Sequence, residues 1–433
     1  MLAEIGLTKP DELFDTIPET LRAPSIDLPE PLGEQDLVAQ LGSLADRNRP
    51  LSHYANFLGA GVYLRFSPAI VRATVSRPEF YTTYTPYQAE ASQGTLQTIF
   101  EFQSMICALT GLDVANASLY DGATAAAEAM VLAVGATGRD RVLVADTLHP
   151  ETLHVLRTFG AGRRIHLDVV ATGGGRLAAE AVRAHITDSH AALMVQQPSF
   201  VGTIEDLAPL AEAAHAAGAL AVSGTDLFAC ALLNPPGEAG FDVAVGDGQP
   251  LGIPVSFGGP HVGFMSVRQE LVRRMPGRLA GMTVDSAGER AYTLTLQARE
   301  QHIRREHATS NICTNHALIA LAATVYMAHM GAGGMRKIAE VSVQRAHHLA
   351  EQLSAIHGFS LVHPDAPFLW EFALRCPGDA ATFAAAMRER GIIAGLPLGR
   401  VDPSRSDQLL VSCTELTPPD AIEHYVTAAR ELA

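Results

Sequence analysis

The sequence predicts an α/β protein with a large domain built on a mostly parallel sheet and a smaller C-terminal α+β domain. Short apolar or β-branched runs alternate with alanine-rich helical stretches between about residue 115 and residue 310, as in a parallel sheet covered by helices. A long apolar helix then leads into a shorter series of strands and helices. Hydrophobic residues make up 48% of the 433 residues, which is enough for a large buried core.

Composition excludes several classes of protein. The net charge is −15 with no basic run, so we expect no nucleic acid partner. The N-terminus lacks the pattern of a signal peptide, and no uninterrupted apolar run reaches the roughly 18 residues of a membrane span. The run that comes nearest, Ala317–Met330, fits a buried helix. Five scattered cysteines predict reduced thiols, a cytoplasmic location and no metal site.

The chain divides into three expected parts. Residues 1–90 form an N-terminal helical or irregular segment that prolines at positions 10, 18, 24, 29, 32 and 50 break into short pieces. Such a segment more often wraps another surface than folds alone. Residues 91–315 form the large α/β domain, and residues 316–433 form the small α+β domain.

Predicted strands and helices alternate along the large domain. The predicted buried parallel strands are Arg141–Ala145, Ile165–Ala171, Ala191–Gln196, Leu220–Val222, Val243–Val245 and Val262–Val267. The predicted helices between them are Ala123–Val134, Leu177–Ile186 and Glu205–Ala217.

The small domain begins with a helix from Asn315 into the 330s, which Gly331, Gly333 and Gly334 are expected to end, and a second helix at Gln344–Ile356. The remaining predicted elements are strand Phe368–Leu374, helix Ala380–Arg390, strands Ile392–Ala394 and Gln408–Ser412, and helix Pro418–Leu432. Thr417 is the expected N-cap of the last helix, with Pro418 at its first position.

A polar stretch, Tyr84–Gly94, precedes a helix that starts near Thr95. Its candidate contacts to substrate or to a partner are Tyr84, Thr85, Tyr87, Gln88, Ser92 and Gln93. Such a loop presents several donors and acceptors to a polar ligand. It fits an ordinary polar turn equally well.

Two glycine-containing stretches follow strands. Ser118–Thr124 runs into an alanine-rich helix, and small residues at a helix N-terminus leave backbone N–H groups free to bind an anion. A tight turn that needs Gly122 is the alternative. Residues 245–263 are rich in glycine and proline between two strands, where sheets of this kind bind ligands, so we favour a binding site over a surface loop there.

The stretch Leu296–Thr314 carries unusual cationic density for an acidic chain. Arg299 and His302 are three residues apart, so on one helix they would share a face. That face could bind a carboxylate or a partner's acidic surface. A solvated helix with internal ion pairs is an equal alternative.

At these stretches the chain resembles the α subunit of glycine dehydrogenase (decarboxylating). The resembling segments include FLGAGVY (Phe57–Tyr63), RPEFYTTYTPYQ (Arg77–Gln88), the long run Ser92–Ala129, GDGQPLGIPVSFGGPHVGF (Gly246–Phe264), LTLQAREQHIRRE (Leu294–Glu306) and ATSNICTN (Ala308–Asn315). Uninterrupted matches of this length are specific.

The resemblance implies a fold type I, aspartate aminotransferase-like large domain of the pyridoxal-phosphate-dependent transferases. It also implies a lysine-bearing β subunit as partner in an α2β2 assembly, with pyridoxal phosphate held by that partner and none bound by this chain alone. Gln249 falls at the position of the Schiff-base lysine, and Ser223 at that of the aspartate that pairs with the pyridine nitrogen. An amide forms no imine, and a hydroxyl does not stabilise a pyridinium as a carboxylate does. No catalytic residue is therefore expected on this chain alone.

The implied reaction is the decarboxylation of glycine in the glycine cleavage system, with the aminomethyl group passing to the lipoyl group of H-protein. Departures from the family pattern are Leu64, Arg65 and Phe66 in place of Asp-His-Tyr, and His307 in place of lysine. They leave open a related subunit that acts on another amino acid. A non-catalytic scaffold or regulator is a further alternative. A self-sufficient pyridoxal enzyme is disfavoured, because Lys9 and Lys337 are the only lysines and neither follows a sheet strand.

Overall fold

The computed structural model describes residues 1–22 and 27–433, so Pro24 lies outside the described residues. Internal contacts divide the chain into two units, Met1–His53 and Tyr54–Ala433. The elements of the first unit are η1 (Ala3–Ile5), η2 (Pro10–Phe14), η3 (Glu19–Leu21), α1 (Glu34–Ala45) and η4 (Leu51–His53). None of these described elements buries a residue, and α1 leaves its leucines exposed. The three-part division at residues 90 and 315 stays a prediction.

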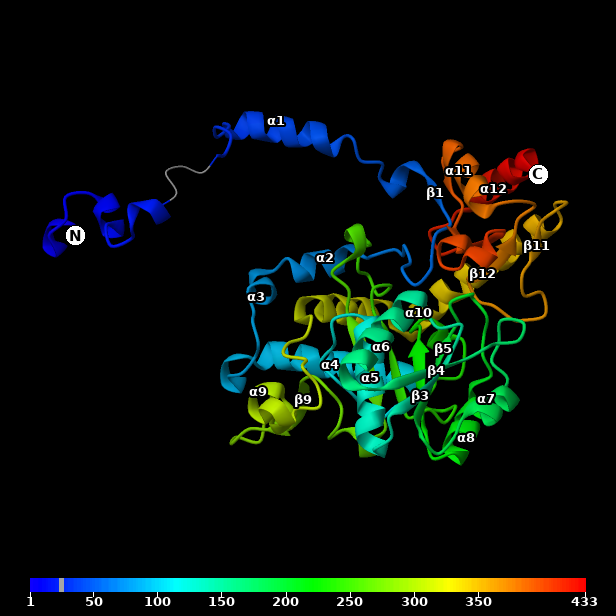
Figure 1. Cartoon of the computed structure of the whole chain (residues 1–433), viewed down its shortest axis with the longest axis horizontal. Coiled ribbons are helices and arrows are strands. Elements are labelled where there is room, and N and C mark those ends of the chain that lie inside the picture. Colours follow the sequence, from blue (N-terminus) through cyan, green and yellow to red (C-terminus); the bar gives the residue numbers. More distant parts are fainter. Residues whose placement is uncertain (23–26) are drawn as a thin grey trace. The chain divides into compact units, whose positions relative to one another are not determined.

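A seven-stranded sheet of order β2-β8-β7-β6-β5-β3-β4 forms the centre of the second unit (Figure 1). Its strands are β2 (Val114–Ala115), β3 (Arg141–Ala145), β4 (His166–Val170), β5 (His190–Gln197), β6 (Leu220–Thr225), β7 (Val243–Asp247) and β8 (Gly263–Val267). The five strands from β3 to β7 are parallel, as predicted.

The predicted parallel direction of the strand at 262–267 is wrong, because β8 pairs antiparallel with β7. A parallel pair needs a crossover that carries the chain back to the opposite end of the strands. Here the connection between β7 and β8 holds only the short turn η7 (Ser256–Gly258). The chain re-enters the sheet at the same end of the strands at which β7 leaves it.

Helices pack on the sheet and form two large apolar cores with it. They are α4 (Gln93–Thr110), α5 (Gly122–Thr137), α6 (Pro150–Arg163), α7 (Ala179–His185) and α8 (Leu207–Ala216). Helices α5 to α8 contribute to one core, and α4 contributes to the other, which continues into the C-terminal part. Neighbouring residues of β8, Phe264 and Met265, belong to different cores, as the alternation of a strand requires.

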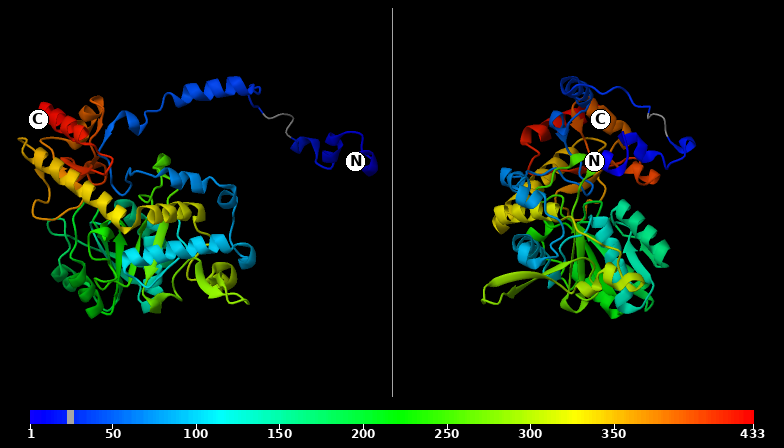
Figure 2. Two further views of the ribbon diagram at one scale, coloured as in Figure 1. Left: turned by 180° about the vertical axis from the view of Figure 1, so that it is seen from behind. Right: turned by 90° about the vertical axis from the view of Figure 1, so that its left-hand side faces the viewer.

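The two helices predicted after residue 315 are one, α10 (Ala317–Ser354), which packs beside α4 (Figures 1 and 2). Only Gly331 leaves helical geometry, with φ 60° and ψ 178°, and the helix resumes at once. Glycine takes such a positive φ without a steric penalty, so the chain kinks there and continues. By length and composition α10 could cross a membrane, but Leu321, Met327 and Leu349 are buried in the protein's own core.

The C-terminal part holds a four-stranded antiparallel sheet of order β11-β12-β15-β14. Its elements are β11 (Ser360–Leu361), β12 (Glu371–Arg375), α11 (Ala380–Glu389), β13 (Ile392–Ile393), β14 (Leu396–Pro397), η11 (Leu398–Arg400), η12 (Pro403–Arg405), β15 (Gln408–Ser412) and α12 (Pro419–Leu432). Strand β13 instead pairs in parallel with β1 (Ala55–Asn56). The predicted cap is one residue early: Pro418 is the N-cap, and the Thr417 hydroxyl accepts from the Thr414 N–H over 3.0 Å.

The second unit also has several shorter elements outside these two sheets. They are α2 (Ala69–Val75), α3 (Pro78–Tyr81), η5 (Ala89–Ala91), η6 (Ala229–Ala231), η8 (Gln269–Leu271), β9 (Leu279–Val284), β10 (Arg290–Thr295), η9 (Gln297–Arg299), α9 (Gln301–Arg304) and η10 (Arg305–His307). The antiparallel hairpin β9–β10, which the sequence did not predict, projects from the body (Figure 2, right). Its Met282 and Val284 side chains are exposed.

Candidate functional site

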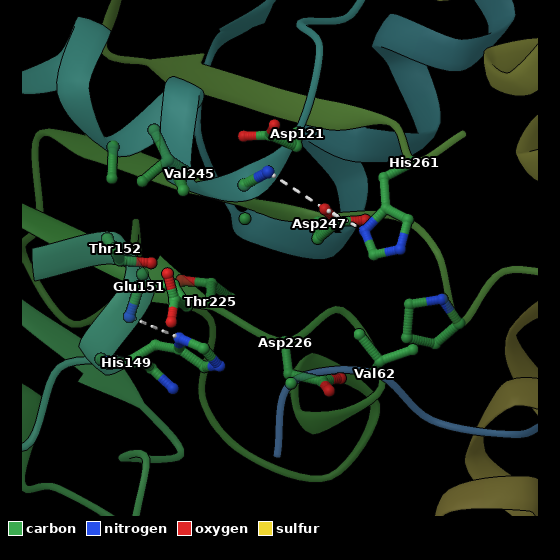
Figure 3. Close-up of a pocket in the computed structure, with 18 of the residues that line it drawn as sticks. Val62, Asp121, His149, Glu151, Thr152, Thr225, Asp226, Val245, Asp247 and His261 are labelled. Atoms are coloured by element: carbon green, nitrogen blue, oxygen red, sulfur yellow. Dashed lines mark hydrogen bonds and ion pairs between the residues drawn. The ribbon is translucent and has the colours of Figure 1, made fainter. Parts of the chain in front are cut away.

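A cavity of about 410 Å³ lies where the sheet, the N-termini of α5 and α6 and the start of β12 meet (Figure 3). Residues at the ends of β5, β6 and β7 line one side of it, and Trp370 and Glu371 come from the C-terminal part. Carboxyl ends of parallel strands are where sheets of this type bind ligands. Both glycine-containing stretches predicted as sites contribute to the lining, through Gly122 and Gly246 among others.

The N-terminus of α5 is occupied by the chain's own carboxylates. The Asp121 side chain accepts from the Thr124 N–H over 2.7 Å, and Asp247 Oδ2 accepts from the Gly122 N–H over 3.1 Å. Asp247 Oδ2 also lies 3.0 Å from His261 Nδ1, and this hydrogen bond raises the pKa of His261. An anion-binding helix terminus needs free N–H groups. Here two of these groups already have negatively charged partners.

A neutral imidazole stands at the start of α6. His149 Nδ1 accepts from the Glu151 N–H over 3.2 Å, so its Nε2 carries the proton and donates to the Ala60 carbonyl over 3.0 Å. Burial lowers the pKa of His149, which keeps the ring uncharged near neutral pH. The ring therefore offers no cation to the cavity.

Two carboxyl groups, those of half-buried Asp226 and buried Glu371, face the cavity. Asp226 Oδ1 accepts from the N–H groups of Phe228 and Ala229. Glu371 accepts from the Ala60 N–H over 2.6 Å and from the Tyr63 hydroxyl over 2.9 Å. Burial raises the pKa of Asp226, and it raises the pKa of Glu371 to about 7.

The lining carries several carboxyl groups, and the imidazole of His261 is already paired with Asp247, which raises the pKa of that imidazole. The carboxyl groups are those of Asp121, Glu151, Asp226, Asp247 and Glu371, and no lysine or arginine is among the described lining residues. Coulomb interactions are strong where water is largely excluded. A phosphate dianion would meet repulsion here, whereas a neutral or cationic group would not.

Gln249 and Ser223 lie beside the cavity without lining it. The Gln249 amide is 1% exposed and bonds to the backbone N–H and carbonyl of Tyr63, each over 3.1 Å, and to the Ile253 carbonyl over 2.8 Å. The Ser223 hydroxyl lies 2.8 Å from the Thr225 hydroxyl. Both side chains are thus used for internal hydrogen bonds.

The residues that depart from the family pattern have structural contacts. The Arg65 side chain pairs with Glu415 over 2.8 Å, bonds to Ser342 over 3.2 Å and stacks 4.2 Å from the centre of the Phe228 ring. The Leu64 carbonyl accepts from Thr414, and the Phe66 N–H donates to Glu415. His307 is exposed. Residues 64–66 therefore tie the C-terminal part to the segment that leads into α2.

None of the eight predicted contact residues lines this cavity. Tyr84 is 82% exposed, Tyr87 and Gln88 are exposed, and Thr85 and Ser92 are half-buried. Gln93 bonds through its side chain to the backbone N–H and carbonyl of Tyr292, so its role is structural. Whether the others contact a partner stays a prediction.

Arg299 and His302 do not share a helix face, which corrects the prediction. Arg299 ends η9, Glu300 is extended, and His302 lies in α9, so the two side chains are not on one helix. The Arg299 guanidinium donates to the carbonyls of Met275, Gly277 and Leu296. It is therefore used within the chain.

Arg278, a residue that the sequence did not single out, connects the candidate stretches Tyr84–Gly94 and Leu296–Thr314. Its Nη2 donates to the Tyr87 hydroxyl over 3.2 Å, and its Nη1 donates to the Thr314 hydroxyl over 3.3 Å. Its Nε lies 3.8 Å from Glu300 Oε2. The side chain is only 4% exposed. A lone arginine before an unpredicted strand carries no sequence signal that could have identified it.

The fold is that of the fold type I class of pyridoxal-phosphate-dependent enzymes. The structure is similar to aspartate aminotransferase of subgroup IV from Thermus thermophilus, with a TM-score of 0.60 over 87% of this chain and 99% of that chain. At 16% identity, that similarity concerns the fold alone.

The chain belongs to the glycine cleavage system P-protein family, whose model matches residues 1–428. It is 49% identical to a probable glycine dehydrogenase (decarboxylating) subunit 1 from Thermomicrobium roseum, over 100% of this chain and 96% of that protein. It is 46% identical to the protein of the same description from Moorella thermoacetica, over 99% and 96%. A crystal structure of glycine decarboxylase (P-protein) of the glycine cleavage system, in inhibitor-bound form, matches with a TM-score of 0.91 and 43% identity, over 100% of this chain and 97% of that chain.

Proposed function

We propose that this chain is the lysine-free subunit of a two-chain glycine decarboxylase. It acts with a lysine-bearing β subunit that holds pyridoxal phosphate, which supplies the electron sink for loss of the glycine carboxylate. The aminomethyl group then passes to the lipoyl group of H-protein. The observation that carries the proposal is membership of the P-protein family together with a cavity that has no amine.

The cavity does not fit pyridoxal phosphate. An imine requires an amine, and the position at Gln249 offers only an amide that is bonded to backbone groups of Tyr63 and Ile253. The helix terminus that would hold the phosphate is occupied by Asp121 and Asp247. These two features act together, so restoring a lysine alone would not restore binding.

The exposed apolar residues of the first unit support a partner chain. On α1, Leu37, Leu41 and Leu44 fall on one stripe, and all are exposed. Contiguous apolar surface of this kind marks a protein interface. We propose that the stripe packs on the lysine-bearing subunit within an α2β2 assembly in the cytoplasm.

The test is to assay exchange between glycine and labelled bicarbonate with this chain, its lysine-bearing partner and H-protein. The full mixture should exchange, and omission of this chain should abolish exchange. Exchange by the partner and H-protein alone at an unchanged rate would overturn the proposal. Replacing glycine with alanine or serine tests the alternative substrate that the departures at residues 64–66 leave open.

A further inference from the structure

Arg278 joins two segments that are far apart in the sequence, and we propose that it is a positioning residue for the partner's active site. In this role it holds Tyr87, Thr314 and the Glu300–His302 pair as one polar surface. We refer to these groups as the Arg278 surface. The inference rests on the proposed function, because it assigns the surface to the lysine-bearing subunit.

Hydrogen bonds to the backbone on either side of its side chain fix the position of Arg278. The Arg299 guanidinium donates to the carbonyls of Met275 and Gly277, the residues of the turn that leads into Arg278. Gly277 has φ 80°, a conformation that other residues rarely adopt. The Arg278 carbonyl then accepts from the Ala117 N–H over 2.9 Å. The backbone of Arg278 is therefore held on both sides.

The guanidinium of Arg278 distributes its donors over both segments. One nitrogen holds the Tyr87 hydroxyl and another the Thr314 hydroxyl, and the group lies 5.5 Å from the centre of the Tyr87 ring. A planar guanidinium donates to the two hydroxyl groups from two separate nitrogens, whereas a lysine ammonium donates from a single nitrogen. Arg278 Nε has no hydrogen-bond partner among the described residues, although Glu300 lies within ion-pair distance.

Glu300 extends the connection to a group at the surface. Its Oε2 lies 3.6 Å from His302 Nδ1, and the His302 side chain is 46% exposed while that of Glu300 is 7% exposed. The buried pair of Arg278 and Glu300 thus supports an exposed imidazole on one side. On the other side it supports Tyr87, which is 54% exposed. Support from buried residues is what orients a functional group at a surface.

The surroundings of the Arg278 surface fit a protein partner. Tyr81 and Tyr84 are exposed by 69% and 82%, and Ile303 by 49%. Exposed tyrosines beside ordered polar groups are typical anchors of protein interfaces. Neither Tyr87 nor His302 lines this chain's own cavity. Because the proposed function supplies the lysine-bearing subunit as partner, we assign these exposed groups to the cleft of that subunit.

The experiment measures glycine–bicarbonate exchange by the assembled pair with Arg278→Gln, Arg278→Lys and Tyr87→Phe. Arg290→Gln is the matched control, because Arg290 also lies over a tyrosine ring, 5.9 Å from the centre of Tyr292, but is exposed. Each variant is titrated against a fixed amount of partner. The maximal rate at saturation is thereby separated from the affinity between the subunits.

We expect Arg278→Gln to lower the saturating rate about ten- to a hundred-fold, which is the effect of losing charge-assisted hydrogen bonds. Arg278→Lys should not restore it, Tyr87→Phe should lower it by a smaller factor, and the double variant should fall no further than Arg278→Gln. The control should keep the full rate. A rate that recovers when excess chain is added would overturn the inference, since it would mean that Arg278 only supports assembly.

Two further results would also count against the inference: a full rate for Arg278→Gln, or additive losses in the double variant. If Arg278→Gln does not fold, the saturating rate of Tyr87→Phe tests the inference instead. Removing one oxygen from an exposed ring leaves the core intact, so this variant should fold. A wild-type pair that shows no exchange would instead refute the proposed function, so the two failures are distinguishable.

Discussion

The Tyr63 hydroxyl donates to Glu371 over 2.9 Å, and this hydrogen bond joins the segment before α2 to the first residue of β12. Both groups are buried, and both border the cavity. Glu371 also accepts from the Ala60 N–H, so a single carboxyl group holds two points of the Gly59–Tyr63 turn. One ionisable side chain thus helps to hold the C-terminal part against this turn, together with the contacts of residues 64–66.

We predict that stability falls as pH rises from about 5 to 8, in part because of Glu371. Its pKa is raised from 4.5 to about 7, so the folded state binds a proton that the unfolded state releases between these values. Glu371→Gln removes this loss, since the amide stays neutral. At about 1.4 kcal/mol for each pKa unit, the variant should gain up to about 3 kcal/mol over the wild type at pH 8 and little at pH 5.

Urea denaturation of both proteins at several pH values measures this difference. Glu389→Gln, at an exposed position of α11, is the control and should follow the wild type. Glu205, whose pKa burial also raises to about 7, is present in all three proteins and contributes equally. Stability curves that run parallel for wild type and Glu371→Gln would contradict the prediction.

The purified chain should be colourless and hold no stoichiometric pyridoxal phosphate. Gln249→Lys should be colourless as well, because Asp121 and Asp247 still occupy the N-terminus of α5. Absorbance between 330 and 430 nm and mass spectrometry after borohydride reduction measure both proteins. A phosphopyridoxyl-lysine in the wild type would refute the assignment of the cofactor to the partner. A phosphopyridoxyl-lysine in Gln249→Lys would show that the carboxylates of Asp121 and Asp247 do not prevent cofactor binding.

Leu41→Glu should weaken binding to the lysine-bearing subunit without changing the fold of the second unit. Leu41 is 55% exposed on α1, so a charge there costs nothing in the free chain but is costly once it is buried by a partner. Ala39→Glu, on the opposite side of the same helix, is the matched control. Analytical size exclusion of each mixture at micromolar concentration measures binding. Equal retention of the partner by both variants would exclude this face from the interface.

Gly59→Ala should destabilise the fold by about 1–3 kcal/mol, as overpacking does. A Cβ at Gly59 would lie 2.3 Å from Glu371 Oε1 and 2.7 Å from Ser412 Cβ. Gly94→Ala is the comparison: Gly94 lies in α4 with no atom within 4 Å of the added carbon, so alanine should be neutral or stabilising there. Thermal unfolding of both variants measures the difference. Equal midpoints would show that the Gly59–Tyr63 turn can relax.

Most of the sheet could be predicted from the sequence, because buried parallel strands such as Arg141–Ala145 are short apolar runs between helices. The direction of β8 could not, since a run of residues has the same periodicity in either direction. At Gly331 the sequence predicts a helix end, and the structure has a kink. Glycine permits both outcomes, and the packing of α10 on both sides of the kink determines which one occurs.

The candidate site was predicted in part. The stretches around Gly122 and Gly246 line the cavity, and their glycine content gave the signal. The sequence does not identify Asp226, Glu371 or Arg278, because a single acid or arginine has no motif. Glu371 and Arg278 moreover bond to Tyr63 and Tyr87, which are more than a hundred positions away. Tyr87 and Arg299 lie in separate stretches of the sequence, and only the fold shows that Arg278 and its turn connect them.

Helix α10 limits how this protein can be divided into fragments for expression. Its N-terminal half carries Tyr326, whose ring meets Phe228 beside the large sheet at 6.2 Å, and its C-terminal half carries Leu353 in the same core. A fragment that starts at residue 316 would expose the first half, and one that stops there would leave Phe228 uncovered. Either fragment should aggregate when produced alone, and co-expression of the two should recover soluble material.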